Sequence, residues 1–276
     1  MVTKRSLLFW RQQHGFTLVE VAVIVPMALL VLGTVFTYMV LLYNESLQAT
    51  AKLGIIDEAT TAVNRINEAG GTSAGFQSAL SSYLTDVNAP SGWNAEPSPG
   101  TSDVLILRSI ATTANTKSAA KKIVRLNKVS GGCTANNEPI NPILYYNTVF
   151  FLKKESGQDT GTLYRRTIAK NTDDSGLAAC DTPVQQKQTC PVGQTNTACS
   201  GTDAVVATDV KQFKVTYAVG GLNCGTAVDT YNDRLCVAGS LAAATNAYIE
   251  LTLSRTTAGE PYEYRATTVI EAVNRR

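Results

Sequence analysis

Glu20 is the residue whose position in this sequence most clearly requires an explanation. It is followed by 24 uncharged residues, 21–44, which is enough to cross a lipid bilayer as a helix. An acidic residue at the centre of a membrane is disfavoured by roughly 2.5–3.5 kcal/mol, so a carboxylate at the edge of such a stretch suggests a function. Lys4, Arg5 and Arg11 precede it without an intervening acid. The pattern predicts a cationic leader, one functional acid and a membrane span.

A cleaved signal peptide and an ordinary membrane anchor are two simpler interpretations of this segment. The apolar run exceeds the roughly 7–15 residues of a signal-peptide core, and residues 35–43 contain no small-residue cleavage site. An uncleaved anchor explains the length and the basic leader, which stays on the cytoplasmic side. It predicts a single-pass protein of the cytoplasmic membrane whose larger part lies outside the cytoplasm. It does not explain Glu20, or Gly15 before it.

Six cysteines follow the apolar segment, an even number that predicts up to three disulfides in an exported domain. They are Cys133, Cys180, Cys190, Cys199, Cys224 and Cys236. Of the fifteen connectivities that six cysteines allow, the most local pairs are Cys190–Cys199 and Cys224–Cys236, which leaves Cys133 with Cys180. Zinc is the alternative use of these thiols. No C-x-x-C pair occurs, however, and the single histidine is His14.

One segment has the spacing of a calcium-binding loop. Asn171, Asp173 and Ser175 alternate ahead of Gly176, as the oxygen ligands and the turn glycine of an EF-hand loop do. Thr182 stands where such a loop carries its bidentate glutamate. Calcium held by Asn171, Asp173 and Ser175 is one interpretation, and a solvated surface loop is the other.

A long helix must carry the apolar segment and continue beyond it. After the span, apolar residues recur every three or four positions while charged and amide residues occupy the positions between them. Gly70-Gly71 predicts the end of the helix. We expect a membrane-spanning half over residues 16–44 and an amphipathic half over residues 45–70, together roughly 80 Å long.

Residues 71–276 are predicted to form a strand-rich head domain. Strands are expected where β-branched and aromatic residues alternate or cluster, over residues 104–110, 123–129, 144–152, 161–168, 210–219, 247–255 and 262–273. A short helix is expected over residues 73–84, and the polar, cysteine-containing stretch 171–208 is expected to be a long surface loop. The predicted fold class is α+β, with one long N-terminal α-helix packed on an antiparallel β-sheet.

Gly15, Phe16 and Glu20, in the order Gly-Phe-Thr-Leu-Val-Glu before an apolar helix, resemble the processing motif of the type IV prepilin and pseudopilin family. The resemblance implies that a prepilin peptidase cuts between Gly15 and Phe16. Residues 1–15 would then be a cleaved leader, and the new Phe16 amine would be N-methylated. The resemblance also implies that Glu20 acts in assembly by pairing with the Phe16 amine of a neighbouring subunit. Such a pair can set the register between subunits, because Coulomb attraction is several-fold stronger in a low-dielectric layer.

The order of the C-terminal segments narrows this resemblance to one subgroup of the family. Residues 209–217 and 248–253, with the closing segment 266–275, are similar to the large minor subunits, namely the J-type pseudopilins of type II secretion and the W-type minor pilins. Those proteins end in Arg-Asn, whereas this chain has Asn274-Arg275. The resemblance implies a structural subunit of a type IV pilus or a type II secretion pseudopilus, with a position at its tip left open. The implied partners are the prepilin peptidase, other pilin or pseudopilin subunits, the inner-membrane assembly platform and membrane lipid.

The composition of the chain argues against nucleic-acid binding and against catalysis. The chain has 24 basic and 22 acidic residues, and loss of the three basic residues of the leader leaves a formal charge of −1, which argues against bulk nucleic acid as a partner. Loss of the leader also removes the single histidine, so the mature chain cannot build a Ser-His, Cys-His or His-metal site, and we expect no enzyme. The alternative is a membrane-anchored adhesin or DNA-binding pilin whose 171–208 loop contacts a ligand. The sequence does not distinguish secretion, motility and DNA uptake.

Overall fold

The computed structural model describes residues 17–77, 80, 86, 103–114, 119–127, 142–170, 179–180, 185–194, 199–218, 244–257 and 259–271. The chain divides into two compact units, one that ends at Ala51 and one that begins at Lys52. Helix α1 (Leu18–Gly70) supplies the whole described part of the first unit and the first element of the second. The helix ends at the predicted glycine pair.

In the first unit, the side chains of α1 are almost entirely exposed, although most of them are apolar. Leu30 and Phe36, for example, are each 70 % exposed. Among the described residues, α1 is the one helix long and apolar enough to cross a membrane, and it lies near the N-terminus. A single N-terminal helix with the length and composition of a membrane span is therefore present, as predicted.

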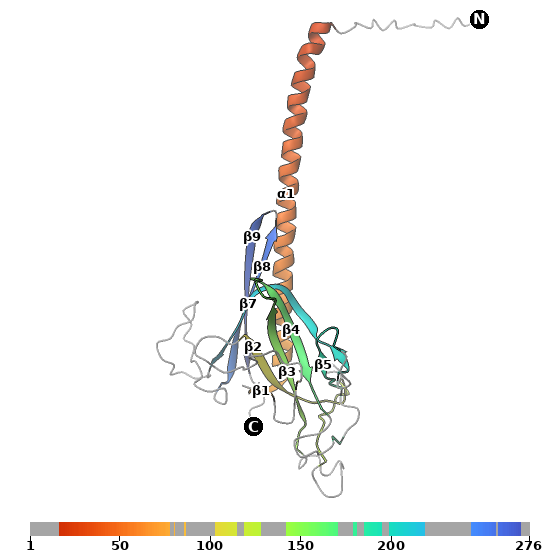
Figure 1. Ribbon diagram of the computed structural model, residues 1–276, viewed down its shortest axis with the longest axis vertical. Helices are drawn as coiled ribbons and strands as arrows, with labels where there is room; N and C mark the ends of the chain where they lie inside the picture. The colour runs from red at the N-terminus through yellow and green to blue at the C-terminus, as the bar shows by residue number, and fades with distance from the viewer. Residues whose placement is uncertain are drawn as a thin grey trace, which may run out of the picture. The chain divides into compact units, whose positions relative to one another are not determined.

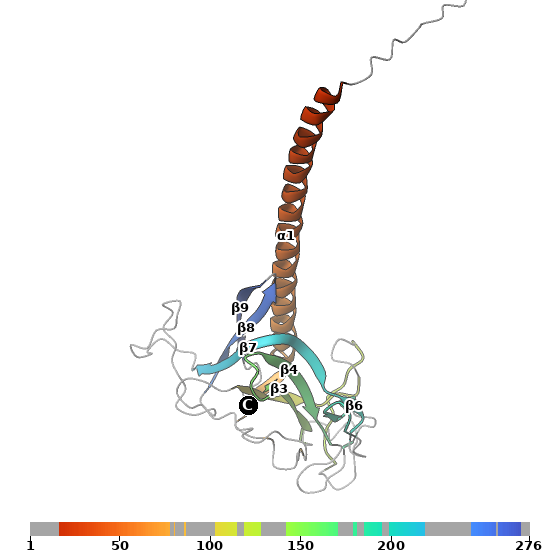
Figure 2. The same ribbon diagram turned by 45° about the horizontal axis from the view of Figure 1, so that its top comes forward.

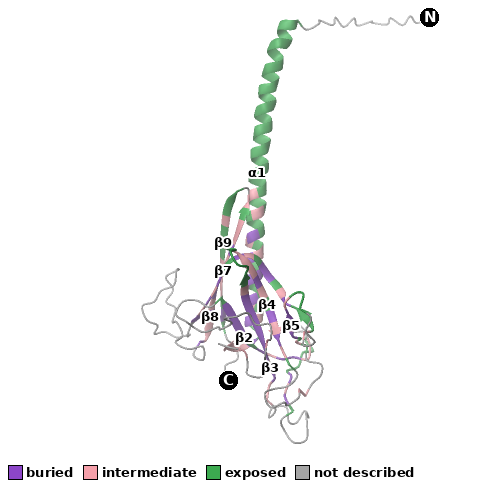
Figure 3. Cartoon of the chain, viewed as in Figure 1, coloured by how far each residue is buried: buried purple, intermediate pink, exposed green. Residues whose placement is uncertain are grey.

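In the second unit, α1 buries one face. Ile55, Ala59, Ala62, Val63 and Ile66 are each at most 8 % exposed. Their spacing of three or four residues places them on one side of a helix with 3.6 residues per turn. The same side chains belong to the main hydrophobic core together with residues of the sheet. Figure 3 shows this change along the helix, from exposed positions to buried ones. The amphipathic pattern was correctly predicted.

Seven strands form one antiparallel sheet in the order β1-β2-β3-β4-β7-β8-β9 (Figure 1). Their bounds are β1 (Ser73–Gln77), β2 (Val104–Ile110), β3 (Tyr145–Lys154), β4 (Gly161–Ile168), β7 (Ala204–Ala218), β8 (Asn246–Thr257) and β9 (Glu260–Glu271). Neighbours in the sheet are also neighbours along the chain, apart from a small parallel pair of β5 (Thr189–Cys190) and β6 (Gly201–Thr202) inserted between β4 and β7. The predicted α+β layout of one long helix and an antiparallel sheet is confirmed.

The sheet has an apolar cluster on each face. On one face, side chains of β2, β3, β4, β7, β8 and β9 join the buried side of α1 in the main core. The β8–β9 hairpin lies alongside the helix in both Figure 1 and Figure 2, and Lys52 Nζ lies 5.4 Å from the ring centroid of Tyr262 in β9. On the other face, Ile106, Phe151 and Ile168 belong to a second cluster. Both faces of β2, β3 and β4 are therefore covered.

Three predictions about the head domain were wrong in part. Residues 73–77 form strand β1 rather than the start of a helix, because they pair with β2, with Phe76 opposite Leu107. The expected loop 171–208 contains β5 and β6 and ends early, since β7 begins at Ala204. The segment 123–126 makes isolated bridges, such as that between Arg125 and Ile143, instead of a full strand. For residues 73–77, the partner strand β2, which lies about 30 residues away in sequence, decides the conformation.

Candidate functional site

The first turn of α1 is closed by a reciprocal cap between Thr17 and Glu20. Glu20 Oε2 accepts hydrogen bonds from the Thr17 amide and from Thr17 Oγ1, both at 2.9 Å, and the Glu20 amide donates to Thr17 Oγ1 at 3.3 Å. This arrangement is a capping box, and an acid in the first turn also complements the helix dipole. No described residue donates to the other oxygen, Oε1. Glu20 is therefore held at the start of the apolar helix and keeps an acceptor for a further partner.

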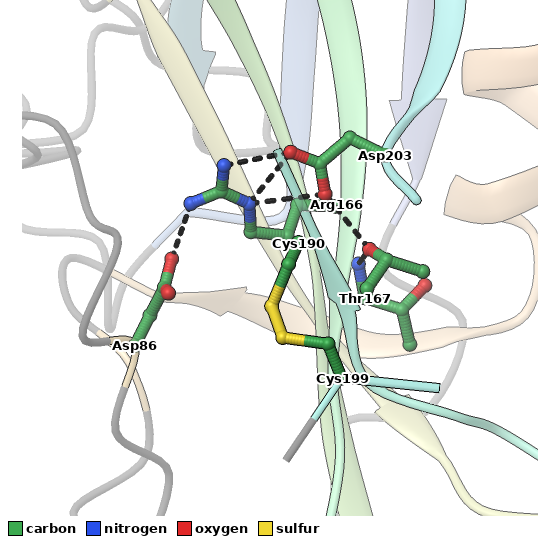
Figure 4. The surroundings of a disulfide bond; sticks show 7 residues. Asp86, Arg166, Thr167, Cys190, Cys199 and Asp203 are labelled. Carbon is green, nitrogen blue, oxygen red and sulfur yellow. Dashed lines mark hydrogen bonds and ion pairs between the residues drawn. A yellow bond between two sulfur atoms is a disulfide. The ribbon is translucent and has the colours of Figure 1, made fainter. Parts of the chain in front are cut away.

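A buried ion cluster of Arg166, Asp86 and Asp203 lies in the head domain (Figure 4). The three side chains are at most 2 % exposed. Arg166 Nε lies 3.1 and 3.0 Å from the two Asp203 oxygens, Nη2 lies 2.6 Å from Asp203 Oδ2, and Nη1 lies 2.5 Å from Asp86 Oδ2. Burial lowers the pKa of Arg166, but the bonds to both carboxylates outweigh this effect and raise it. The guanidinium therefore stays charged, and its ion pairs attach the segments that carry Asp86 and Asp203 to strand β4.

The disulfide Cys190–Cys199 adjoins this cluster, as Figure 4 shows. Its Cα atoms are 5.8 Å apart. The Asp203 amide donates to the carbonyl oxygen of Cys190 at 2.8 Å, and Thr189 Oγ1 donates to Asp203 Oδ1 at 2.9 Å. This pair confirms the predicted local disulfide. Cys180 is also disulfide-bonded, and its partner lies outside the described residues.

A second polar network joins the helix to strands β7 and β8. Glu58 Oε1 accepts from the amide of Thr208 at 2.6 Å and from its hydroxyl at 2.8 Å. Arg255 Nη2 donates to Glu58 Oε2 at 3.0 Å, and Arg255 Nε donates to Asp209 Oδ2 at 2.7 Å. The bond to Asp209 raises the pKa of Arg255. Asp209 has a φ of 52° and lies between Ala207 and Val210, where the pairing of β7 with β4 shifts register, so the network coincides with a strained position.

Several predicted site residues lie outside the described part of the structure. They are Gly15, Phe16, Cys133, Asn171, Asp173, Ser175, Cys224 and Cys236. The predicted cleavage point, the calcium interpretation and two of the three proposed disulfides therefore stay predictions. Among the residues that the structure does describe, no group of three or more His, Cys, Asp or Glu side chains could hold a metal ion.

The sequence interpretation missed the buried ion cluster. Of the two adjacent arginines in β4, Arg165 is exposed and Arg166 is buried. The available signal was strand alternation, because Arg166 shares its face of β4 with Tyr164 and Ile168, and both of those side chains pack into an apolar cluster. A charge on the apolar face of a strand predicts a buried partner. The identity of that partner, 37 residues further along the chain, could not be predicted from the pattern.

Comparisons of this chain with protein-family models, with curated proteins and with solved structures found no match.

Proposed function

We propose that this chain is a minor pilin or pseudopilin. In this proposal a prepilin peptidase removes residues 1–15, the apolar part of α1 anchors the subunit in the cytoplasmic membrane, and the same helix packs with other subunits in a pilus or pseudopilus. The head domain lies outside the cytoplasm and has a structural role rather than an enzymatic one. The type of assembly and a position at its tip are left open.

The observation that carries this proposal is the start of α1. A purely hydrophobic anchor needs no carboxylate in its first turn, and Glu20 is costly there once it enters lipid. The capping box positions the Glu20 carboxylate through Oε2 and leaves Oε1 as an acceptor. A cut between Gly15 and Phe16 would create an amine one residue before Thr17. That amine, on a neighbouring subunit, is a suitable charged donor to Oε1.

The rest of the chain is compatible with assembly through the helix. The exposed apolar side chains from Leu18 to Tyr43 can contact lipid before assembly and other helices afterwards. In the second unit, the buried face of α1 and the Glu58–Arg255 pair anchor the helix in the head domain. A load carried by the helix would therefore reach the sheet through a packed interface.

The experiment expresses the full chain together with a prepilin peptidase and the other subunits of an assembly system. We expect the mature N-terminus to be Phe16 by mass spectrometry, and Glu20→Ala to be cleaved normally but excluded from sedimented filaments. Glu45→Ala removes an exposed acid beyond the apolar stretch and serves as the matched control. An uncleaved chain, or normal incorporation of Glu20→Ala, contradicts the proposal.

A further inference from the structure

The head domain contains a polar pocket of about 240 Å³ that is lined neither by the buried ion cluster nor by the apolar part of α1. Three segments that are distant in sequence form its walls. They are the end of α1 with Arg65 and Glu68, the adjoining strands β3 and β4, and the segment around Lys187. All of these lie in the second unit, so the pocket belongs to the folded head domain itself.

Strands β3 and β4 form one wall of polar side chains in fixed register. Thr148 pairs directly with Thr167, and Tyr146 and Arg165 each lie two residues away along their strands. Because side chains two residues apart share a face, these four groups project to the same side of the sheet. Burial raises the pKa of Tyr146, and hydrogen bonds with Ser109 and Thr148, together with the positive charge of Arg165, partly oppose this effect.

The opposite wall is held in place by hydrogen bonds on both sides of Lys187. The Gln185 amide donates to the Thr112 carbonyl at 2.9 Å, and the Gln186 side chain both accepts from the Thr112 amide at 2.9 Å and donates to its hydroxyl at 3.0 Å. Thr189, two residues after Lys187, accepts from the amide of Thr167 at 2.9 Å. Lys187 therefore projects from an anchored segment.

The third wall, at the end of α1, contributes one cation and one carboxylate. Arg65 Nη1 donates to the carbonyl oxygen of Val205 at 3.1 Å, which orients its guanidinium. Its remaining N–H groups are further donors. The pocket thus combines three cationic side chains, Arg65, Arg165 and Lys187, with the single carboxylate of Glu68. The net positive formal charge of these four side chains favours an anionic ligand.

We propose that this pocket binds a hydroxylated carboxylate of the sugar-acid class, such as a uronic acid. Two guanidinium groups can hold a carboxylate by paired, charge-assisted hydrogen bonds. The half-buried Thr167 of the wall formed by β3 and β4 offers a hydroxyl that suits a hydroxyl group of a sugar, since it can donate and accept a hydrogen bond. The Glu68 carboxylate disfavours a dianionic phosphate. The cavity volume suits one small ring rather than a polymer surface.

Calorimetric titration of the full chain in detergent with glucuronate tests this inference. We expect saturable binding that weakens with salt, because the cations are exposed. Arg165→Gln and Lys187→Gln should each weaken it about tenfold or more, as expected for the loss of a charged hydrogen bond. Lys153→Gln is the matched control, since it makes the same charge change at an exposed β3 residue that does not line the pocket. Its affinity should equal that of the unmodified chain.

Two further titrations define the ligand class. Glucose has the ring and hydroxyls without the carboxylate and should not bind, whereas glucose 6-phosphate should bind more weakly than glucuronate. The proposal is overturned if glucuronate does not bind the unmodified chain, if neither pocket variant weakens its binding, or if glucose 6-phosphate or glucose binds as tightly as glucuronate. Thermal unfolding of each variant checks that the head domain remains folded. None of these results depends on filament assembly.

Discussion

Removal of the Asp203 carboxylate is expected to be among the most damaging single substitutions in the head domain. In Asp203→Ala, the buried Arg166 loses hydrogen bonds from Nε and Nη2 and keeps its bond to Asp86. Thr189 Oγ1 loses its acceptor in the same step. Breaking a buried ion pair by removing one partner costs about 3–5 kcal/mol. Because Asp86 remains, we expect a loss near the lower limit, about 3 kcal/mol.

A loss of about 3 kcal/mol lowers the ratio of folded to unfolded protein by roughly 100-fold. The measurement is urea unfolding of the full chain in detergent, with its disulfides intact, followed by far-ultraviolet circular dichroism. Glu263→Ala is the matched control. It removes the acid of the Lys211–Glu263 pair, whose side chains are 47 % and 46 % exposed, and exposed pairs contribute at most about 1 kcal/mol.

A triple substitution separates the cost of an unpaired charge from the value of the cluster itself. Replacing Arg166 with Met, and both Asp86 and Asp203 with Leu, removes all three charges, so neither a buried guanidinium nor a buried carboxylate loses its ion-pair partner. Such replacements are often neutral or stabilising. We expect the triple variant to be more stable than Asp203→Ala alone. If Asp203→Ala costs no more than Glu263→Ala, the buried ion cluster does not stabilise the fold and this reasoning is wrong.

Two further predictions concern the disulfide and a buried tyrosine. Replacing Cys190 and Cys199 with serine opens a loop with a sequence separation of nine, and the loss of loop constraint should cost about 2–3 kcal/mol in urea unfolding; a loss below about 0.5 kcal/mol would contradict the expectation. Tyr217 is 2 % exposed, and its hydroxyl has no hydrogen-bond partner among the described residues, so Tyr217→Phe should stabilise the head domain by about 1 kcal/mol. Burial raises the pKa of Tyr217, so the folded state holds this proton after the unfolded state releases it near pH 10. The corresponding stability is complete below pH ~10 and is lost as the pH rises further, and the advantage of Tyr217→Phe should therefore grow in alkaline urea titrations. Equal alkaline losses in both proteins would show that this tyrosine does not titrate with unfolding.

Prediction from the sequence succeeded where the deciding interactions are local. The apolar face of α1 from Ile55 to Ile66 follows helical spacing, and the glycines at the end of the helix stop it, so both features are visible in a short window. The Cys190–Cys199 disulfide is another local case, because few residues separate the two thiols. Strands β2 and β4 were predicted with their observed bounds because their residues favour extended structure.

Prediction failed where a distant partner sets the conformation. Residues 73–77 have no strong strand pattern of their own and become extended by pairing with β2, about 30 residues further along the chain. The start of β7 at Ala204 is likewise set by pairing with β4, with Ala204 opposite Arg165. Local propensity cannot report such pairing, since it depends on which strands the tertiary fold brings together.

The sequence by itself determined an apolar helix with one acid at its start, an amphipathic continuation and a strand-rich head domain with a local disulfide. These features depend on composition and on periodicities of 3.6 and 2 residues, which any short segment carries within itself. Only the tertiary structure decided that Arg166 is buried between Asp86 and Asp203, and that Arg65, Arg165 and Lys187 line one pocket. The local sequence around a charged residue does not show which residue, tens of positions away, becomes its partner. The tertiary fold determines which of them are exposed to solvent and which form ion pairs with each other.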